Sequence, residues 1–155
     1  MSGKPASPLR RALVIFGGAA LLLAVATDGL AVIGRHVGVP LLGSIEVVQA
    51  AVLIVSSAAL VVATLDRRHA VVHLLVNRLS DRPKARIERL GNLLAAVLFL
   101  AFLVGSGWIA LDMRGGHEES ELLRIPYAPL RLIELAALLA ITIICLVHAI
   151  RGARK

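Results

Sequence analysis

The chain alternates between long apolar stretches and short segments that hold nearly all of its charge. Four apolar stretches cover residues 13–33, 45–65, 90–111 and 132–150. Each is close to the ~20 residues that a helix needs to cross the hydrocarbon core of a membrane. A soluble domain would need far more polar surface than a chain of 155 residues that is 58% hydrophobic. The pattern predicts an all-α integral membrane protein with four transmembrane helices in one domain, residues 1–155.

A further helix is predicted between the second and third apolar stretches, at about residues 66–80. Its apolar face is formed by Val72, Leu75, Val76 and Leu79, and His69 belongs to the opposite, polar face. An amphipathic helix beside basic residues is expected to lie along the membrane surface instead of crossing it. We therefore expect an interfacial helix on the cytoplasmic side.

The basic residues show which side is cytoplasmic. Thirteen of the seventeen Lys and Arg residues lie before the first span, between the second and third spans, or after the fourth. Basic residues that flank spans remain in the cytoplasm, so both termini are predicted to be cytoplasmic. The net charge of +7 does not indicate nucleic acid, because the charges flank spans and do not form a patch with interleaved aromatic residues. Attraction to anionic membrane lipid explains it better.

Polar residues inside the spans are the first candidates for function. In the second span, Glu46, Gln49, Leu53, Ser56 and Ser57 recur at helical spacing and make a stripe that is more polar than lipid favours. Two interpretations remain open for this stripe. It packs inside a four-helix bundle of this chain, or it is a docking face for a larger membrane partner.

Charged residues near the outer ends of the spans form a second group. It consists of Asp28, Arg35, Glu46, Arg131 and Glu134. Charges at this depth normally pair with each other, so we expect a structural cluster in which Arg35 contacts Glu46 or Glu134. The alternative is a proton or ion relay. No ionisable residue lies near the middle of any predicted span, which argues against a complete path.

Metal, cofactor and enzyme chemistry find little support in the sequence. His69 and His73 are four residues apart and share a helix face, but no third ligand accompanies them at a suitable spacing. The histidines lie in loops or at span ends, which disfavours haem. No phosphate-binding loop, nucleophile–base pair or catalytic carboxylate pair is present. The single cysteine, Cys145, lies in the fourth span and is expected to behave as a small hydrophobe. We expect no cofactor, no metal and no enzymatic activity.

Several short motifs follow one another in a characteristic order. They are Asp28, Gly34-Arg35, Pro40, Ser44-Ile45-Glu46, the basic turn into His69, the Val72…Leu75…Leu79 segment, and Leu123-Arg124-Ile125-Pro126. In order, spacing, length and topology the chain resembles the small membrane subunit of tripartite ATP-independent periplasmic (TRAP) transporters. The resemblance covers most of the chain, from about Asp28 to the fourth span.

The resemblance implies a function that composition did not reveal. Such a subunit binds a larger multi-span subunit, which carries substrate by an elevator motion driven by a sodium gradient. A soluble periplasmic protein delivers the substrate, usually an organic anion. The small subunit would lie in the bacterial inner membrane and brace the fixed scaffold without a substrate site of its own.

Two surfaces are candidates for contact with these partners. The partner face predicted for the large subunit comprises Glu46, Gln49, Leu53, Ser56, Ser57, Ala137, Ile141, Cys145 and His148. The acidic patch predicted for contact with the binding protein comprises Glu118, Glu119 and Glu121. Membrane lipid is the other expected neighbour.

Two other functions compete with this interpretation. A small proton-coupled exporter would need a membrane-embedded carboxylate open to both sides, for which Asp28 is the candidate. An assembly subunit of some other membrane complex would share the composition and the spans.

Overall fold

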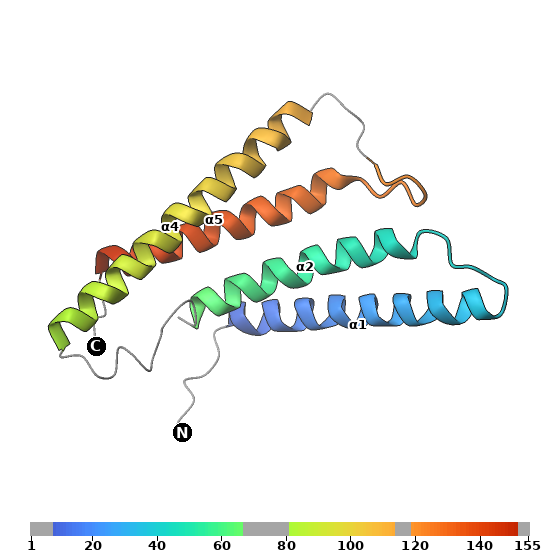
Figure 1. Cartoon of the computed structure of the whole chain (residues 1–155), viewed down its shortest axis with the longest axis horizontal. Coiled ribbons are helices and arrows are strands. Elements are labelled where there is room, and N and C mark those ends of the chain that lie inside the picture. Colours follow the sequence, from blue (N-terminus) through green and yellow to red (C-terminus); the bar gives the residue numbers. More distant parts are fainter. Residues whose placement is uncertain (1–7, 67–80, 114–118, 152–155) are drawn as a thin grey trace, which may run out of the picture.

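Four long helices make up the part of the chain that the computed structural model describes, residues 8–66, 81–113 and 119–151 (Figure 1). They are α1 (Pro8–His36), α2 (Ser44–Leu65), α4 (Asp81–Asp112) and α5 (Tyr127–Arg151). All four are long and apolar enough to cross a membrane, which confirms the four predicted spans. The predicted interfacial helix at 66–80 lies outside the described residues, apart from Asp66.

Two helices begin earlier than the hydropathy pattern indicates. α4 begins at Asp81 and contains Pro83 in its first turn. α5 begins at Tyr127 and contains Pro129 in its first turn. Proline is tolerated there because the first amides of a helix have no partner within the helix. Polar first turns therefore extend both helices beyond their apolar cores.

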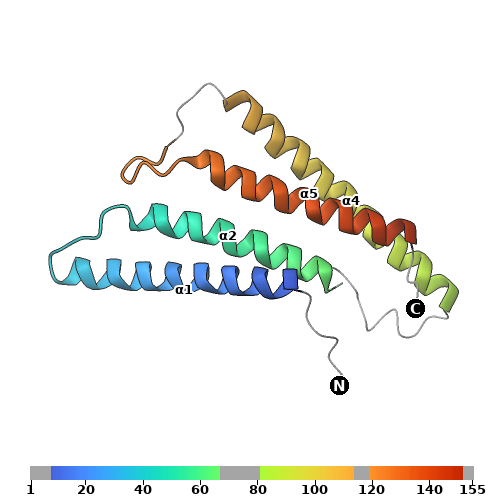
Figure 2. The same cartoon turned by 180° about the vertical axis from the view of Figure 1, so that it is seen from behind.

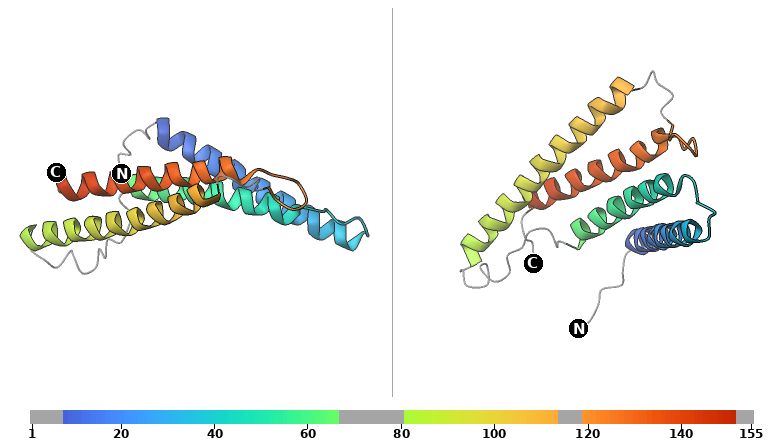
Figure 3. Two further views of the ribbon diagram at one scale, coloured as in Figure 1. Left: turned by 90° about the horizontal axis from the view of Figure 1, so that it is seen from above. Right: turned by 45° about the vertical axis from the view of Figure 1, so that its right-hand side comes forward.

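The helices form a row in the order α1, α2, α5, α4 (Figures 1 and 2). Substantial contacts among the described residues join α1 to α2, α2 to α5, and α5 to α4. Seen from above, the arrangement is thin and open instead of a closed bundle (Figure 3). The α1–α2 loop and the α4–α5 loop lie at the same end of the helices along their axes, and we call this end the loop end. Because α1 and α4 lie at the two edges of the row, each makes its substantial contacts with a single neighbouring helix.

Small residues form the seam between α1 and α2. Ala20 and Ala24 of α1 are buried in one cluster with Ala51 of α2. A Cβ atom added at Gly17 would lie 3.2 Å from the Cβ of Ala58. Residues without bulk let the two backbones approach closely, and close packing drives helix association in a membrane.

Larger side chains join the other three helices. Val61 of α2, Phe99 of α4, and Leu138 and Ile141 of α5 belong to one buried cluster, together with Cys145. Cys145 is a buried free thiol among these apolar groups. At the opposite end from the loops, Arg10 of α1 and Asp66 after α2 form an ion pair of 3.1 Å. Both groups are partly exposed, so the pair contributes only about 0–1 kcal/mol.

Most of the apolar surface remains uncovered by this chain. Only 6% of the α4 span window and 28% of the α2 window are buried within the structure. An open row of four apolar helices therefore requires lipid or another membrane protein along both of its broad faces.

Candidate functional site

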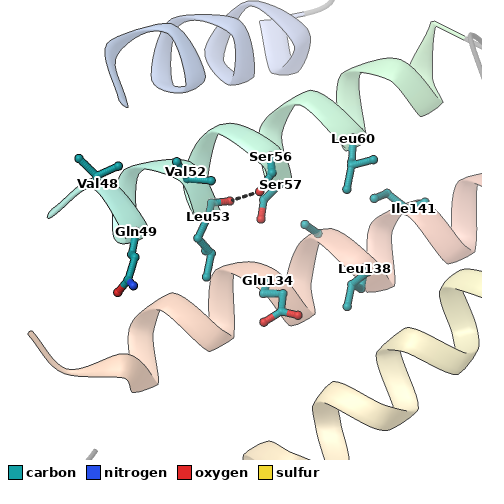
Figure 4. Close-up of a pocket in the computed structure, with 11 residues that line it drawn as sticks. Val48, Gln49, Val52, Leu53, Ser56, Ser57, Leu60, Glu134, Leu138 and Ile141 are labelled. Carbon is teal, nitrogen blue, oxygen red and sulfur yellow. Dashed lines mark hydrogen bonds between the residues drawn. The ribbon is translucent and has the colours of Figure 1, made fainter. Parts of the chain in front are cut away.

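A groove with a volume of about 540 Å³ runs between α2 and α5 (Figure 4). Its lining consists of Val48, Gln49, Val52, Leu53, Ser56, Ser57, Leu60, Glu134, Ala137, Leu138 and Ile141. Helical spacing explains the α2 side, because positions 49, 53, 56 and 60 recur on one face of a helix. The groove is therefore a regular furrow between two packed helices.

The polar groups of the groove divide into covered and open ones. Ser57 is buried, whereas Gln49 and Ser56 are exposed along the groove. The Ser56 hydroxyl donates to the Leu53 carbonyl oxygen at 3.1 Å, within its own helix (Figure 4). The predicted stripe on α2 thus serves partly for packing and partly as an open surface. Of its open members, the Ser56 hydroxyl is bonded within the helix, whereas the Gln49 amide carries hydrogen-bonding groups that lipid tails cannot satisfy.

Glu134 is the acidic side chain of the groove. It is half-buried, and its Oε1 accepts a hydrogen bond of 2.9 Å from the Ser106 hydroxyl of α4. A second hollow of about 290 Å³ shares Gln49, Leu53 and Glu134 with the groove. Because they share these residues, the two hollows adjoin. The remaining lining of the second hollow is Glu46, Ala50, Ser120, Ile125, Tyr127, Leu130 and Arg131.

The expected charge cluster forms only in part. Glu46, Arg131 and Glu134 line the second hollow together. The expected contact of Arg35 with Glu46 or Glu134 is wrong: Arg35 is exposed, and its Nε donates to the Ala31 carbonyl oxygen at 3.3 Å. Glu134 is out of reach because α2 lies between α1 and α5 in the row. The Glu46 carboxylate is on the neighbouring helix but binds backbone amides of the α4–α5 loop.

Glu46 has a different partner, which the sequence did not indicate. Its two carboxylate oxygens accept hydrogen bonds from the backbone amides of Leu122 and Leu123, each at 2.8 Å. A Cβ atom at Gly43 (φ 80°) would lie 2.6 Å from Cγ of Leu123, so the α4–α5 loop lies directly on the start of α2. Glu46 therefore acts as an anchor for that loop.

The loop that Glu46 holds has its own internal bonds. The Ile125 amide donates to the buried Ser120 hydroxyl at 2.9 Å, and the Ser120 amide donates to the Ile125 carbonyl oxygen at 3.0 Å. Arg124 adopts φ 51°, a left-handed conformation that is uncommon for residues other than glycine. The sequence signal was the Leu123-Arg124-Ile125-Pro126 motif, whose geometry only the fold reveals.

We expect Glu46→Gln to loosen the α4–α5 loop. A carboxylate presents acceptors to both amides, whereas a glutamine side chain turns an NH₂ group toward one of them. Amide hydrogen exchange at Leu122 and Leu123 should become faster in the variant. Glu119→Gln, on an exposed side chain of the same loop, is the control and should leave both rates unchanged. Equal protection in wild type and Glu46→Gln would contradict the anchoring role.

Other predicted residues have distinct places. Ile141 and Cys145 belong to the buried cluster between α2, α4 and α5, so their surfaces are covered within the chain. His148 is half-buried farther along α5. Of the acidic patch, Glu119 and Glu121 are exposed on the loop, and Glu118 lies outside the described residues. Asp28 is exposed on α1.

Metal ligands do not gather in the part of the chain that the structure describes. No three or more His, Cys, Asp or Glu residues there could hold an ion together. His69 and His73 lie outside that part. The expectation of no metal and no cofactor remains a prediction.

Comparison with known proteins identifies a family for this chain. A family model described as "Tripartite ATP-independent periplasmic transporters, DctQ component" matches residues 23–155. No curated protein and no solved structure matches the chain.

Proposed function

Because the chain belongs to the DctQ family of TRAP transporters, it is the small permease component of such a transporter, and we propose that it braces the large permease subunit through the α2–α5 groove. As a family member with four membrane-spanning helices, it is a multi-pass protein of the bacterial inner membrane. Its family is one of transporter components.

The open groove is the observation that carries the proposal. Gln49 and Ser56 are exposed there, within a span that is otherwise strongly apolar. Polar groups that face hydrocarbon are unfavourable, whereas across a helix–helix contact they form hydrogen bonds. The open row of helices also leaves broad faces for a larger membrane protein. Both features suit a scaffold better than a self-contained carrier.

The rest of the transport cycle is assigned to the partners. The large subunit would move an organic anion by an elevator motion coupled to sodium, against the scaffold that this chain widens. A periplasmic binding protein would deliver the substrate. The exposed Glu119 and Glu121 lie on the loop that Glu46 anchors, and this held loop is our candidate for contact with the binding protein.

We base the proposed orientation on the positions of the basic residues. α1 and α4 begin, and α5 ends, at the end of the helices opposite the loop end (Figure 1). Arg10 and Arg11 lie in the first turn of α1, and Arg89 lies in the first third of α4. The positive-inside rule places that end in the cytoplasm and the loop end in the periplasm.

A bulky side chain in the groove tests the docking face. We expect Ser56→Trp to reduce recovery of the large subunit with the tagged small subunit at least about tenfold, because the indole fills the space that the partner would occupy. Ala59→Trp is the control: it is exposed on the same helix but does not line the groove. Both variants are compared with wild type by co-purification after co-expression.

The same co-purification distinguishes docking through the groove from docking elsewhere, and a transporter subunit from an assembly subunit of another complex. Full recovery of the large subunit with Ser56→Trp would show that docking occurs elsewhere. Purification of the wild-type chain with subunits of a different membrane complex, and without a large permease, would favour an assembly role.

A further inference from the structure

Four leucines gather at the loop end, outside the helices. Leu41 and Leu42 belong to the α1–α2 loop, and Leu122 and Leu123 belong to the α4–α5 loop. Each of the four is between 46% and 71% exposed. A Cβ atom at Gly43 would meet the Leu123 side chain, so the two pairs lie next to each other. We call these four residues the leucine patch. Exposed apolar patches on a fold mark contact with a membrane or a partner.

The packing of α1 on α2 fixes the depth of the leucine patch. Gly17 lies opposite Ala58, because a Cβ atom added at the glycine would come within 3.2 Å of the alanine Cβ. The two helices run antiparallel (Figure 1). Fourteen residues toward the loop end, from 17 to 31 on α1 and from 58 to 44 on α2, Ala31 therefore reaches the level of Ser44. This is the level at which α2 begins.

The same register marks the two boundaries of the hydrocarbon core. At the opposite end, Arg10 and Asp66 form their ion pair of 3.1 Å, and charges of this kind are favourable outside the hydrocarbon. The 22 residues of α2 extend about 33 Å from this pair to the loop end. The hydrocarbon core is about 30 Å thick, so α2 begins at its boundary. Tyr127 lines the second hollow together with Glu46, and tyrosine is enriched at this boundary.

The leucine patch lies at this boundary. Leu42 precedes the first residue of α2, Ser44, by two positions. The amides of Leu122 and Leu123 donate to the carboxylate of Glu46, in the first turn of α2, each at 2.8 Å. Both pairs of leucines are therefore held at the depth where the hydrocarbon ends.

The α1–α2 loop lies within the adjoining headgroup region. α1 continues to His36, five residues or about 7.5 Å past the level at which α2 begins. The headgroup region on each side of the core is roughly 5–7 Å thick, which matches this excursion. The Val39 amide donates to the Gly34 carbonyl oxygen at 2.8 Å and holds the loop against the end of α1. No charged residue stands between His36 and Glu46, so nothing in this segment opposes contact with lipid.

We propose that the leucine patch inserts into the membrane leaflet at the loop end, with its side chains against the acyl chains just below the headgroups. The patch continues the exposed apolar surface of the spans, because Ile33 and Ile45 beside it are 60% and 72% exposed. Insertion ties both loops to the membrane surface. The exposed Glu119 and Glu121 of the α4–α5 loop then remain on the aqueous side, where their charges are solvated.

A protein partner fits this position less well. A soluble protein approaches from beyond the headgroup region, whereas the leucine patch lies at the base of that region. A membrane subunit seated between α2 and α5 occupies a different surface, because none of the four leucines lines the groove. The inference therefore does not depend on which protein fills the groove, and the co-purification with Ser56→Trp tests the groove separately.

Nitroxide labels on the full chain test the insertion in phosphatidylethanolamine–phosphatidylglycerol vesicles. Cys145→Ala removes the native thiol, and Leu42→Cys and Leu122→Cys each introduce one labelling site. Leu22→Cys, at a 72% exposed position midway along α1, is the reference for lipid, and Glu119→Cys is the reference for water. We expect collisions with a water-soluble nickel chelate to be at least about fivefold rarer at positions 42 and 122 than at position 119. Collisions with oxygen, which concentrates in the hydrocarbon, should approach the value at position 22.

The same labels distinguish lipid from a protein cover. Chelate collisions at positions 42 and 122 that equal those at position 119 would overturn the proposal. The measurement is repeated on the chain assembled with a cysteine-free large subunit, and lipid contact predicts the same oxygen collisions there. A loss of both oxygen and chelate collisions on assembly, or on addition of the periplasmic binding protein, would show that a protein covers the patch and would also overturn it. Circular dichroism of each labelled chain confirms that the helices are retained.

Discussion

Ile141→Ala is expected to lower the free energy of unfolding of the isolated subunit by about 2–5 kcal/mol, the usual cost of truncating a fully buried isoleucine. Ile141 has a relative exposure of 0% and is the one large side chain among the described residues that is completely covered. It belongs to the cluster that joins Val61 of α2, Phe99 of α4 and Leu138 of α5. Its removal would leave a cavity at the junction of three helices.

Ile143 offers a matched control on the same helix. Its side chain is 52% exposed, so Ile143→Ala removes the same atoms without creating an internal cavity. Both variants are measured by unfolding in mixed micelles with increasing denaturing detergent, without the large subunit. A loss for Ile141→Ala no greater than for Ile143→Ala would contradict the placement of Ile141 at the junction.

Gly34→Ala is expected to disrupt the α1–α2 connection, at a cost of about 1–3 kcal/mol. The chain turns back after α1, and a Cβ atom at Gly34 would collide with the carbonyl oxygen of Val39. The Val39 amide also donates to the Gly34 carbonyl oxygen at 2.8 Å, which holds the turn close. Because the obstacle is backbone, a change of side-chain rotamer cannot relieve the contact.

Gly29 lies in the same helix, and we expect its replacement by alanine to have the opposite effect on stability. A Cβ atom there meets nothing within 4 Å, so Gly29→Ala should stabilise α1 by about 0.5–1 kcal/mol through its better helix propensity. Unfolding midpoints of the two alanine variants, measured in the same micelles, should therefore move in opposite directions. A shift of the same sign and size for both would show that the turn does not pack on Gly34.

At the loop end, the fold shows a role for Glu46 that its sequence motif does not reveal. Ser44, Ile45 and Glu46 begin α2, so the Glu46 carboxylate meets the positive end of the helix dipole. The fold gives Glu46 a second role, because its carboxylate binds the amides of Leu122 and Leu123, more than seventy residues away. No local pattern encodes that contact. Sequence reasoning missed it, together with the bond between Ser106 and Glu134.

The number and position of the spans could be read from the chain alone. The thickness of a bilayer sets a length that each apolar stretch must reach, so hydropathy and the positions of Arg and Lys suffice. The four helices confirm this prediction, and the polar first turns of α4 and α5 extend beyond it. The small residues Gly17, Ala20 and Ala24 are also visible in the sequence of α1, and α2 packs closely against them.

The neighbours of each helix could not be read in the same way. In a membrane the surfaces that face lipid and those that face protein are about equally apolar, so hydropathy does not distinguish them. The order α1, α2, α5, α4 separates Arg35 from Glu134, buries Ile141 and Cys145, and leaves Gln49 and Ser56 open. Those outcomes depend on side-chain shape across helix pairs that are distant in sequence. Bilayer thickness therefore determines the number and length of the helices, which the sequence reveals. Close packing between helices determines which of them are neighbours and where the groove lies, and only the tertiary structure shows this.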